Sequence, residues 1–493
     1  MGAAPQRVGD PLGIVLTVRE KAIDLAAEGT PGERVVGISA DPDDAIAVDL
    51  RHHAARIEAV ERAGRLDDAE HQGQSLPHSL FSRRSKRGKY MLVGQSAMDF
   101  EYAQEHEAVR KEFRDWLASN LPPELCLDDP ADDRVASDRE TFERRRAWQK
   151  TMHAAGWVGI TWPKEYGGRG LGLIERVIWD EEYGTARAPV LPGNMALNLV
   201  GPTIIHWGTD EQRRRHLPAI LNADEVWCQG FSEPGAGSDL AALQTRAGDA
   251  GDHFVVNGQK VWTSGAQFAH WIILLVRTDP QAPKHKGISC LLVPMSTPGI
   301  TVRPLVLMTG HHHFNEVFFA DVKVPKENLL GPINQGWKVS TTTLMYERHS
   351  AGSRGYTAQI ARLVQLARQV PIDGRPAWEN PWIRQRLAQL AIDAEVFKYT
   401  RLRSLTRQLR GEPPGPEGSI LKLTGSELGV RIADVAGELL GMHVLVNRPS
   451  ETVPDAPRWF NRVLAARQYT ISAGTSEIQR NILGERVLGL PKG

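Results

Sequence analysis

The 493-residue sequence lacks the features that mark disulfide-rich, membrane-spanning or nucleic-acid-binding proteins. It has only three cysteines, Cys126, Cys228 and Cys290, whose wide separation fits neither a disulfide framework nor a zinc cluster. No apolar run approaches the roughly 20 residues that cross a bilayer. Lysine plus arginine and aspartate plus glutamate both total 59, so no net charge favours a nucleic-acid partner. We therefore expect a protein of a reducing compartment, the cytoplasm, without membrane insertion.

The sequence is ordinary in its overall composition, with 41% hydrophobic and 24% charged residues. Its length is large for one core and predicts two or three domains. Residues 1–97 have no sustained apolar period and end in a basic run at 83–87, typical of a solvated linker. We interpret residues 1–97 as a disordered or non-native extension, with Met98 as the expected start of the native protein.

Apolar periodicity divides the rest of the chain into three parts. Val109, Phe113 and Leu117 recur at helical spacing, and Pro122 ends that helix. Residues 226–330 contain β-branched runs punctuated by glycine, proline and asparagine, which predict strands. Helical signals return over 337–370, 382–410, 419–440 and from Thr475 onward. The pattern predicts an α+β protein with domains at 98–224, 225–331 and 332–493.

Two short motifs indicate a flat cofactor. Ser232–Asp239 is a small-residue loop whose glycines let backbone N–H groups approach a ligand closely. Phe254–Val256, Asn257-Gly258 and Gln259–Trp262 predict two strands joined by a type I′ turn, directly before two hydroxyl side chains. A flavin needs backbone donors along its pyrimidine edge and an aromatic wall beside its face. Taken alone, the loop is more often a surface turn and Trp262 a core residue.

In this order and spacing, the motifs resemble those of the acyl-CoA dehydrogenase family of flavoenzymes, over roughly residues 98–491. The runs at 271–279, 287–294 and 314–325 resemble strands of its β domain, and 473–480 resembles its C-terminal signature. The resemblance implies a helical N-terminal domain, a middle β-barrel domain and a C-terminal four-helix bundle. It also implies FAD as cofactor, an acyl-CoA substrate converted to a trans-2-enoyl-CoA, and an electron-transfer flavoprotein as electron acceptor.

The resemblance offers two positions for the general base. One is Ala473 here, which cannot accept a proton; the other, on the first long helix of the C-terminal domain, is Glu347. Glu347 shares a helical stripe with Thr341 and Leu344 that we expect to face inward. Desolvation there would raise the pKa of Glu347 towards that of a general base. The alternative is a structural ion pair with Arg348 or with an arginine elsewhere in the chain; otherwise we assign Arg348 to the substrate side.

The remaining site residues follow from the same resemblance. It implies that the Ala473 backbone N–H, with a flavin ribityl hydroxyl, binds the thioester oxygen, and that Ser238 lines the thioester end. It assigns cofactor contacts to Phe231 and Ser232 at the pyrimidine edge, Trp262 at the flavin face, Ser264 near N5, and Gly474, Thr475 and Glu477 near the adenosine-side phosphates. For the last three, an ordinary helix start is the alternative.

Two segments depart from the family pattern. In the family, one loop carries an arginine that reaches the FAD of a neighbouring subunit. The corresponding loop in this sequence is 373–378, and Arg375 is the candidate replacement for that arginine. The family's glutamine-and-double-glycine segment is altered at 437–442. Both belong to the half-site that one subunit donates to another, so we expect a mixed α₂β₂ tetramer, with a homotetramer as the alternative. We interpret His311–His313 as an ordinary loop and not as a metal site.

Two alternative functions stay open. An acyl-CoA oxidase would let oxygen reoxidise the flavin, and a non-catalytic partner subunit would only complete the FAD site of another chain. The sequence does not identify the acyl chain.

Overall fold

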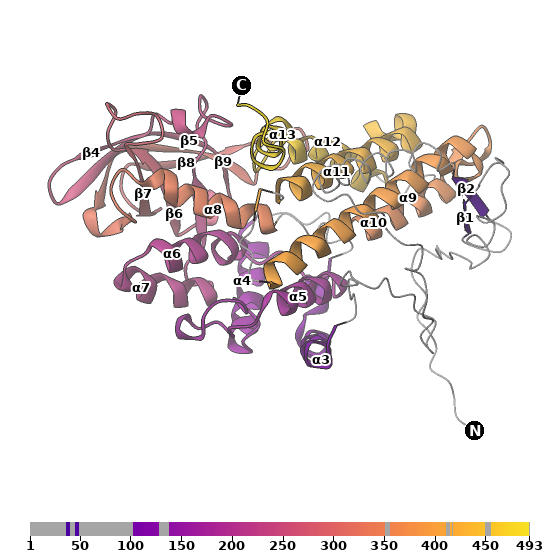
Figure 1. Cartoon of the computed structure of the whole chain (residues 1–493), viewed down its shortest axis with the longest axis horizontal. Helices are drawn as coiled ribbons and strands as arrows, with labels where there is room; N and C mark the ends of the chain where they lie inside the picture. Colours follow the sequence, from indigo (N-terminus) through magenta and orange to yellow (C-terminus); the bar gives the residue numbers. More distant parts are fainter. Residues whose placement is uncertain are drawn as a thin grey trace, which may run out of the picture.

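The computed structural model describes residues 102–127, 138–350, 355–410, 415–416, 418–448 and 455–492, with backbone alone at 347–350, and the backbone of two short strands before them. These strands, β1 (Val36–Ser39) and β2 (Ala45–Val48), pair antiparallel. The remainder of the expected extension at 1–97 lies outside the described residues. Figure 1 shows the β domain at one end of the molecule, the C-terminal helices at the other, and the N-terminal helices along one side.

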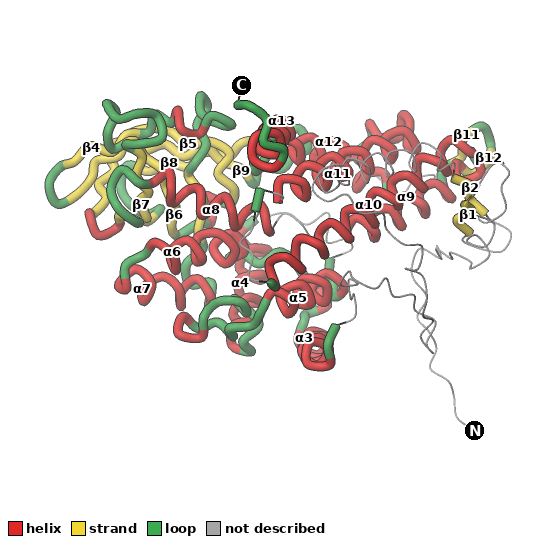
Figure 2. The backbone as a smooth tube through the Cα atoms, in the orientation of Figure 1, coloured by secondary structure: helices red, strands yellow, loops and turns green. Residues whose placement is uncertain are grey.

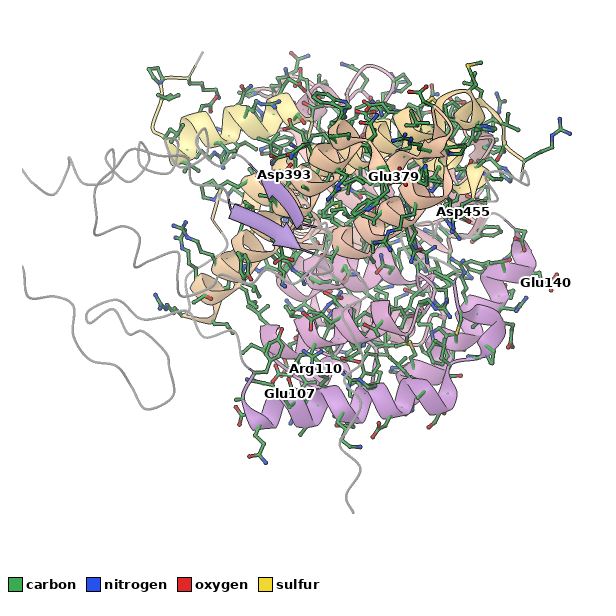
Figure 3. All side chains as sticks on the ribbon, turned by 90° about the vertical axis from the view of Figure 1, so that its right-hand side faces the viewer. Glu107, Arg110, Glu140, Glu379, Asp393 and Asp455 are labelled. Atoms are coloured by element: carbon green, nitrogen blue, oxygen red, sulfur yellow. The ribbon has the colours of Figure 1, made fainter. Side chains whose placement is uncertain are left out.

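The N-terminal domain is helical, as predicted. Its helices are α3 (Gln104–Asn120), α4 (Arg139–Ala154), α5 (Leu173–Thr185), α6 (Gly201–Trp207) and α7 (Asp210–Leu221). The apolar stripe of α3 buries Phe113 and Leu117, and the helix ends before Pro122 as expected. On the same face of the helix Arg110, beside Glu107 in Figure 3, pairs with the buried Glu182 of α5 at 2.7 Å. Apolar packing and this ion pair join α3 to α5.

The middle domain is an eight-stranded, mostly antiparallel sheet. Its strands are β3 (Trp227–Gly230), β4 (Arg246–Asp249), β5 (His253–Ser264), β6 (Trp271–Arg277), β7 (Ile288–Pro294), β8 (Ile300–Leu305), β9 (Phe314–Pro325) and β10 (Leu329–Leu330). They pair in the order β10-β7-β6-β4-β5-β9-β8, and β3 pairs with β6. Central β6 is buried along nearly its whole length, as its unbroken apolar sequence requires.

The predicted hairpin at Asn257-Gly258 is wrong. β5 runs unbroken from His253 to Ser264, pairing with β9, and the dipeptide forms an irregularity in that pairing. A Cβ at Gly258 would lie 2.5 Å from the side chain of Thr245, directly before β4, so the close approach of the neighbouring chain explains this glycine. The Asn257 side chain bonds to both the backbone and the side chain of Asp321 across the irregularity.

The C-terminal domain is a helical bundle, formed mainly by α9, α10 and α11 (Figure 1). Its elements are α8 (Gly336–Ser350), α9 (Tyr356–Gln369), β11 (Pro371–Ile372), β12 (Arg375–Pro376), α10 (Pro381–Leu409), α11 (Gly418–Leu440), α12 (Ala456–Ala465) and α13 (Ser476–Ile482). Where a single helix was expected over 337–370 the structure has two, α8 and α9, and α9 begins after Gly355, which has a left-handed φ of 56°. No helix in the described ranges is long and apolar enough to cross a membrane.

Candidate active site

A buried ion pair holds the small-residue loop that follows β3. Lys260 Nζ, with no exposed surface, donates to Glu233 Oε1 at 2.8 Å and to the Phe231 carbonyl oxygen at 3.1 Å. Glu233 also accepts from the backbone N–H groups of Gln244 and Thr245, at 2.6 and 2.9 Å. The ion pair therefore connects β5 to the start of the loop and fixes the position of the Phe231 backbone.

The two charges shift each other's titration. Burial lowers the pKa of Lys260 to about 8, although Glu233 opposes that change. Desolvation acts to raise the pKa of Glu233, but the Lys260 ammonium and the two N–H donors together lower it. Sequence analysis missed this pair. The available signal was that Lys260 lies at the same period-two positions as Phe254 and Val256, on a buried face where a charge requires a partner.

Trp262 points outward from β5 on an irregular backbone. Its φ is 61°, a left-handed value that bulky residues rarely adopt, and it lies in a register shift between Lys260 and Thr263. Its side chain is 57% exposed, whereas Val261 and Thr263 are buried. Its ring lies nearly perpendicular to that of Phe314, with 6.0 Å between the ring centroids. The alternative that Trp262 is a core residue is therefore wrong. Such backbone strain concentrates at functional sites.

Backbone contacts bring four of the expected cofactor residues together. Val261 N–H donates to the Ser232 carbonyl at 2.9 Å, so the loop after Phe231 lies against the strand that carries Trp262 and Ser264. The loop backbone is open, because a Cβ built at Gly235 or Gly237 would meet no atom within 4 Å. An exposed indole, a half-buried hydroxyl and an accessible loop backbone lie next to one another, and this donor set fits a flavin.

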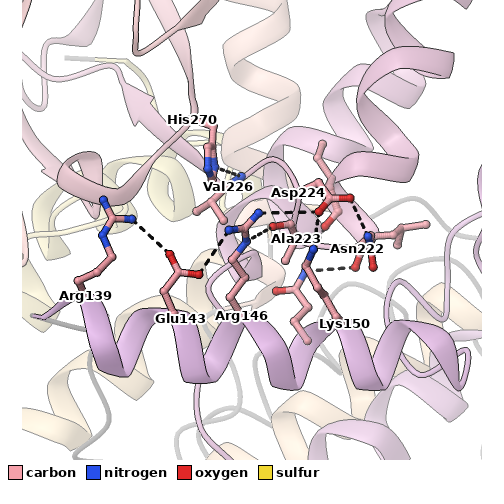
Figure 4. A network of polar contacts seen from close by, with 12 residues as sticks. Arg139, Glu143, Arg146, Lys150, Asn222, Ala223, Asp224, Val226 and His270 are labelled. Atoms are coloured by element: carbon pink, nitrogen blue, oxygen red, sulfur yellow. Dashed lines mark hydrogen bonds and ion pairs between the residues drawn. The ribbon is translucent and has the colours of Figure 1, made fainter.

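A cavity of about 90 Å³ lies beyond Ser264 and Gly265. Its wall is largely apolar, with residues from 190–195, α4 and the start of β3, and includes the side chains of Arg145 and Asn194. Figure 4 shows the network that holds α4 in this wall. Arg146 donates to the Ala223 carbonyl at 2.7 Å, and His270 Nδ1 accepts from Val226 N–H at 3.0 Å. Desolvation, with Arg146 nearby, lowers the pKa of His270, which suits its role as a neutral acceptor.

The helix of the expected base is buried most deeply on a face beside the predicted stripe, and Trp337 of that stripe is partly buried against the core. Val339, Ser340 and Thr343 are buried, because that side of α8 lies against β7 and α6, whereas Thr341 of the predicted inward stripe is exposed. Leu344, also on that stripe, is half-buried against the core. The backbone of Glu347 and Arg348 lies in the last turn of α8, and their side chains lie outside the described residues.

The C-terminal signature follows a strained turn into α13. Ala473 and Gly474 have φ of 55° and 87°, and Thr475 is the N-cap, its Oγ1 accepting from Ile478 N–H at 3.2 Å. Glu477 is exposed in the first turn. Thr475 therefore has the helix-start role that was the alternative to phosphate binding. Because α8 and α13 both pack on α11, the helix of Glu347 and the signature share one neighbour.

Four predicted positions lie apart from these groups or at the surface. Arg375 is exposed after a tight turn with left-handed Asp373 and Gly374, and Figure 2 shows this β11–β12 hairpin at the far end of the bundle from β5. Ser238 is exposed. His311 and His312 are exposed, and the described residues contain no group of three or more metal-ligating side chains.

Comparisons with known proteins cover most of the chain. The acyl-CoA dehydrogenase N-terminal, middle and C-terminal domains match residues 103–224, 228–322 and 334–488. The acyl-CoA dehydrogenase IpdE1 of Mycobacterium tuberculosis is 39% identical over 399 residues, 79% of this chain and 99% of that protein. The solved ChsE4–ChsE5 complex of the same organism is similar at TM-score 0.68 and 34% identity, covering 80% of this chain and 100% of that chain. The solved structure of the Tcur3481–Tcur3483 steroid ACAD is similar at TM-score 0.69 and 32% identity, and the match covers 80% of this chain and 100% of that chain.

Proposed function

This chain belongs to the acyl-CoA dehydrogenase family, whose members bind FAD, and we propose that it converts an acyl-CoA thioester to the trans-2-enoyl-CoA with Glu347 as general base. The observation that carries the proposal is the exposed, strained Trp262 beside the loop that Lys260 and Glu233 anchor. A chain that served only to complete another subunit's site would not need this arrangement. When bound, FAD supplies the acceptor for the β-hydride.

The chain's own residues bind the flavin, remove the α-proton and stabilise the charge on the thioester oxygen. Phe231 and Ser232 present backbone groups to the flavin edge, Trp262 covers one face, and Ser264 lies near the reacting end. Glu347 takes the α-proton while the β-hydrogen leaves with its electron pair, so that the carbon–carbon double bond forms. The Ala473 N–H stabilises the negative charge on the thioester oxygen, a contribution that does not require a side chain. The support for Glu347 is that Ala473 cannot act as a base.

We also propose an assembly with a homologous chain. Strand β12, which begins with Arg375, lies far from β5 of the same chain (Figure 2), as expected of a segment that serves another subunit, and its loop departs from the family pattern. A similar solved structure is described as a complex of two chains, ChsE4 and ChsE5. We expect a mixed α₂β₂ tetramer with about half a FAD per chain. A homotetramer with one FAD per chain and full activity would contradict this.

The proposed electron acceptor is an electron-transfer flavoprotein, and the proposed compartment is the cytoplasm. Cys126, Cys228 and Cys290 are free thiols, and burial raises the pKa of the last two well above the ordinary range. Because one similar structure is described as a steroid ACAD, steroid-derived acyl-CoAs should be tested beside straight-chain ones.

Steady-state oxidation of such a panel, with and without the homologous partner, tests the function. Turnover that requires an electron-transfer flavoprotein and forms little peroxide in air supports a dehydrogenase. Rapid peroxide formation would instead identify an oxidase. Absence of turnover with every substrate and partner would contradict the proposal.

A further inference from the structure

One buried side chain holds the signature turn from inside the bundle. Gln479 of α13 has no exposed surface, and its Nε2 lies 3.2 Å from the carbonyl oxygens of both Ala473 and Gly474, donating one N–H to each. A Cβ at Gly474 would lie 2.6 Å from that nitrogen. The amide therefore occupies the space that the missing side chain of residue 474 leaves, and the two residues fit each other.

This amide holds a backbone conformation that alanine rarely adopts by itself. Both Ala473 and Gly474 are left-handed, at φ 55° and 87°, and only glycine tolerates that region without steric cost. In a planar trans peptide the C=O and N–H groups point in opposite directions. Because both carbonyls are turned toward Gln479, the N–H groups of Gly474 and Thr475 are turned away from it. The orientation of the Ala473 N–H relative to these peptides is set by the φ that the amide maintains.

The turn leaves donors available. No described residue accepts a hydrogen bond from the N–H of Ala473, Gly474 or Thr475. The side chain at 473 is a methyl group, so it adds no polar contact that would fix the turn. The two hydrogen bonds from Gln479 are therefore the contacts that the described residues provide to the carbonyls of Ala473 and Gly474.

We propose that Gln479 is a positioning residue of the dehydrogenation site, which acts through Ala473 by keeping its N–H directed at the thioester oxygen. This inference rests on the proposed function and extends it to a residue that does not touch substrate. Without the amide, Ala473 relaxes from the left-handed region and its N–H leaves the position where charge develops. The reaction then loses part of the stabilisation that one preorganised donor provides.

The chain offers a matched control. Gln212 of α7 is 5% exposed, and its Nε2 donates to the carbonyl oxygens of Glu327 and Leu329, each at 2.9 Å. Like Gln479, it donates to two backbone carbonyls, but these hydrogen bonds connect the N-terminal domain to the segment at β10 and do not involve the signature turn. Gln212→Met thus reports what the loss of a buried amide bridge costs when no donor of the proposed site depends on it.

The test compares Gln479→Met, Gln479→Glu and Gln212→Met with the wild type, each purified with the homologous partner if FAD binding requires it. FAD content and thermal unfolding are measured first, then kcat and KM. The apparent pKa of bound acetoacetyl-CoA is then measured, since its enolate is stabilised by donors at the thioester oxygen. We expect Gln479→Met to lower kcat by about 10- to 100-fold, with KM within about threefold, and to raise the pKa of the bound ligand by about one unit or more.

The control separates positioning from folding. Gln212→Met should lower thermal stability similarly while leaving kcat and the ligand pKa close to wild type. If Gln479→Met does not retain FAD, Gln479→Glu decides, because it preserves size and leaves at most one donor for the two carbonyls. Unchanged kcat and ligand pKa in a folded Gln479 variant, or changes no larger than those of Gln212→Met, would overturn the inference. A wild type that oxidises no acyl-CoA yet ionises acetoacetyl-CoA in a Gln479-dependent way would contradict the proposed function and leave the positioning role supported.

Discussion

Breaking the buried ion pair beneath the loop should destabilise β5 strongly, and the effect should depend on which partner remains. Glu233→Gln removes the counter-charge of Lys260, which has no exposed surface, so that the pKa of Lys260 falls further and the amine can lose its proton, whereas Lys260→Met leaves a carboxylate that is 7% exposed. Removing one member of a buried pair typically costs about 3–5 kcal/mol, since the other charge stays desolvated. Replacing both together should recover part of this cost, because neither charge then remains buried.

Hydrogen exchange measured by mass spectrometry on a peptide covering 253–264 gives the local effect. A loss of about 3–5 kcal/mol corresponds to exchange roughly 10²- to 10³-fold faster or more, when exchange follows local opening. Lys284→Met is the matched control, because Lys284 pairs with Asp239 at the end of the same loop while both side chains are more than half exposed. That pair should contribute at most about 1 kcal/mol.

Two results would refute this reasoning. One is a Glu233→Gln variant whose β5 exchange is no faster than that of Lys284→Met. The other is a Glu233→Gln/Lys260→Met double variant that shows the full sum of the single effects, which would mean that the two charges do not compensate each other.

Further predictions concern the cofactor and the N-terminal domain. Trp262→Ala should lower FAD occupancy and shift the flavin spectrum, since ring stacking is worth roughly 0.5–1.5 kcal/mol beyond area burial; unchanged occupancy and spectrum would remove Trp262 from the site. Glu182 has its pKa lowered despite desolvation, because Arg114 and Arg110 donate to it. Since that folded-state pKa lies below the unfolded value of about 4.3, the stabilisation that Glu182→Gln removes at pH 7 should begin to decrease near pH 4.3 and be lost as pH falls through the folded-state pKa. A wild-type advantage that persists unchanged at pH 3 in thermal unfolding would contradict this.

The fold was largely predictable because its elements carry strong local periods. The α3 stripe, the apolar run of β6 and the breaks at proline and glycine depend on residues close in sequence, and the α+β assignment was correct. The Asn257-Gly258 hairpin failed because a local turn signal was overridden by distant pairing, with β4 on one side and β9 on the other. The inward face of α8 was predicted only in part, with Trp337 and Leu344 against the core and Thr341 exposed, because stripe spacing does not say which partner a helix packs against.

The sequence motifs of the site were predictable, but the conformation of their side chains and the hydrogen bonds that hold them were not. The open loop and Trp262 were visible as sequence motifs, whereas the outward turn of the indole depends on a register shift between β5 and β9. Lys260 and Glu233 are 27 residues apart, and Gln479 reaches back six residues to Ala473. These hydrogen bonds follow from three-dimensional packing, which neither composition nor periodicity specifies.

The most direct test of the central claim is anaerobic bleaching of the flavin after rapid mixing with an acyl-CoA that the wild type oxidises. The wild type, with its partner if required, should lose its visible flavin absorbance in a fast single phase. Glu347→Gln should retain FAD and bleach about 10²- to 10⁴-fold more slowly, because the amide preserves shape but cannot take the α-proton. Bleaching of Glu347→Gln within about tenfold of wild type would contradict Glu347 as the general base.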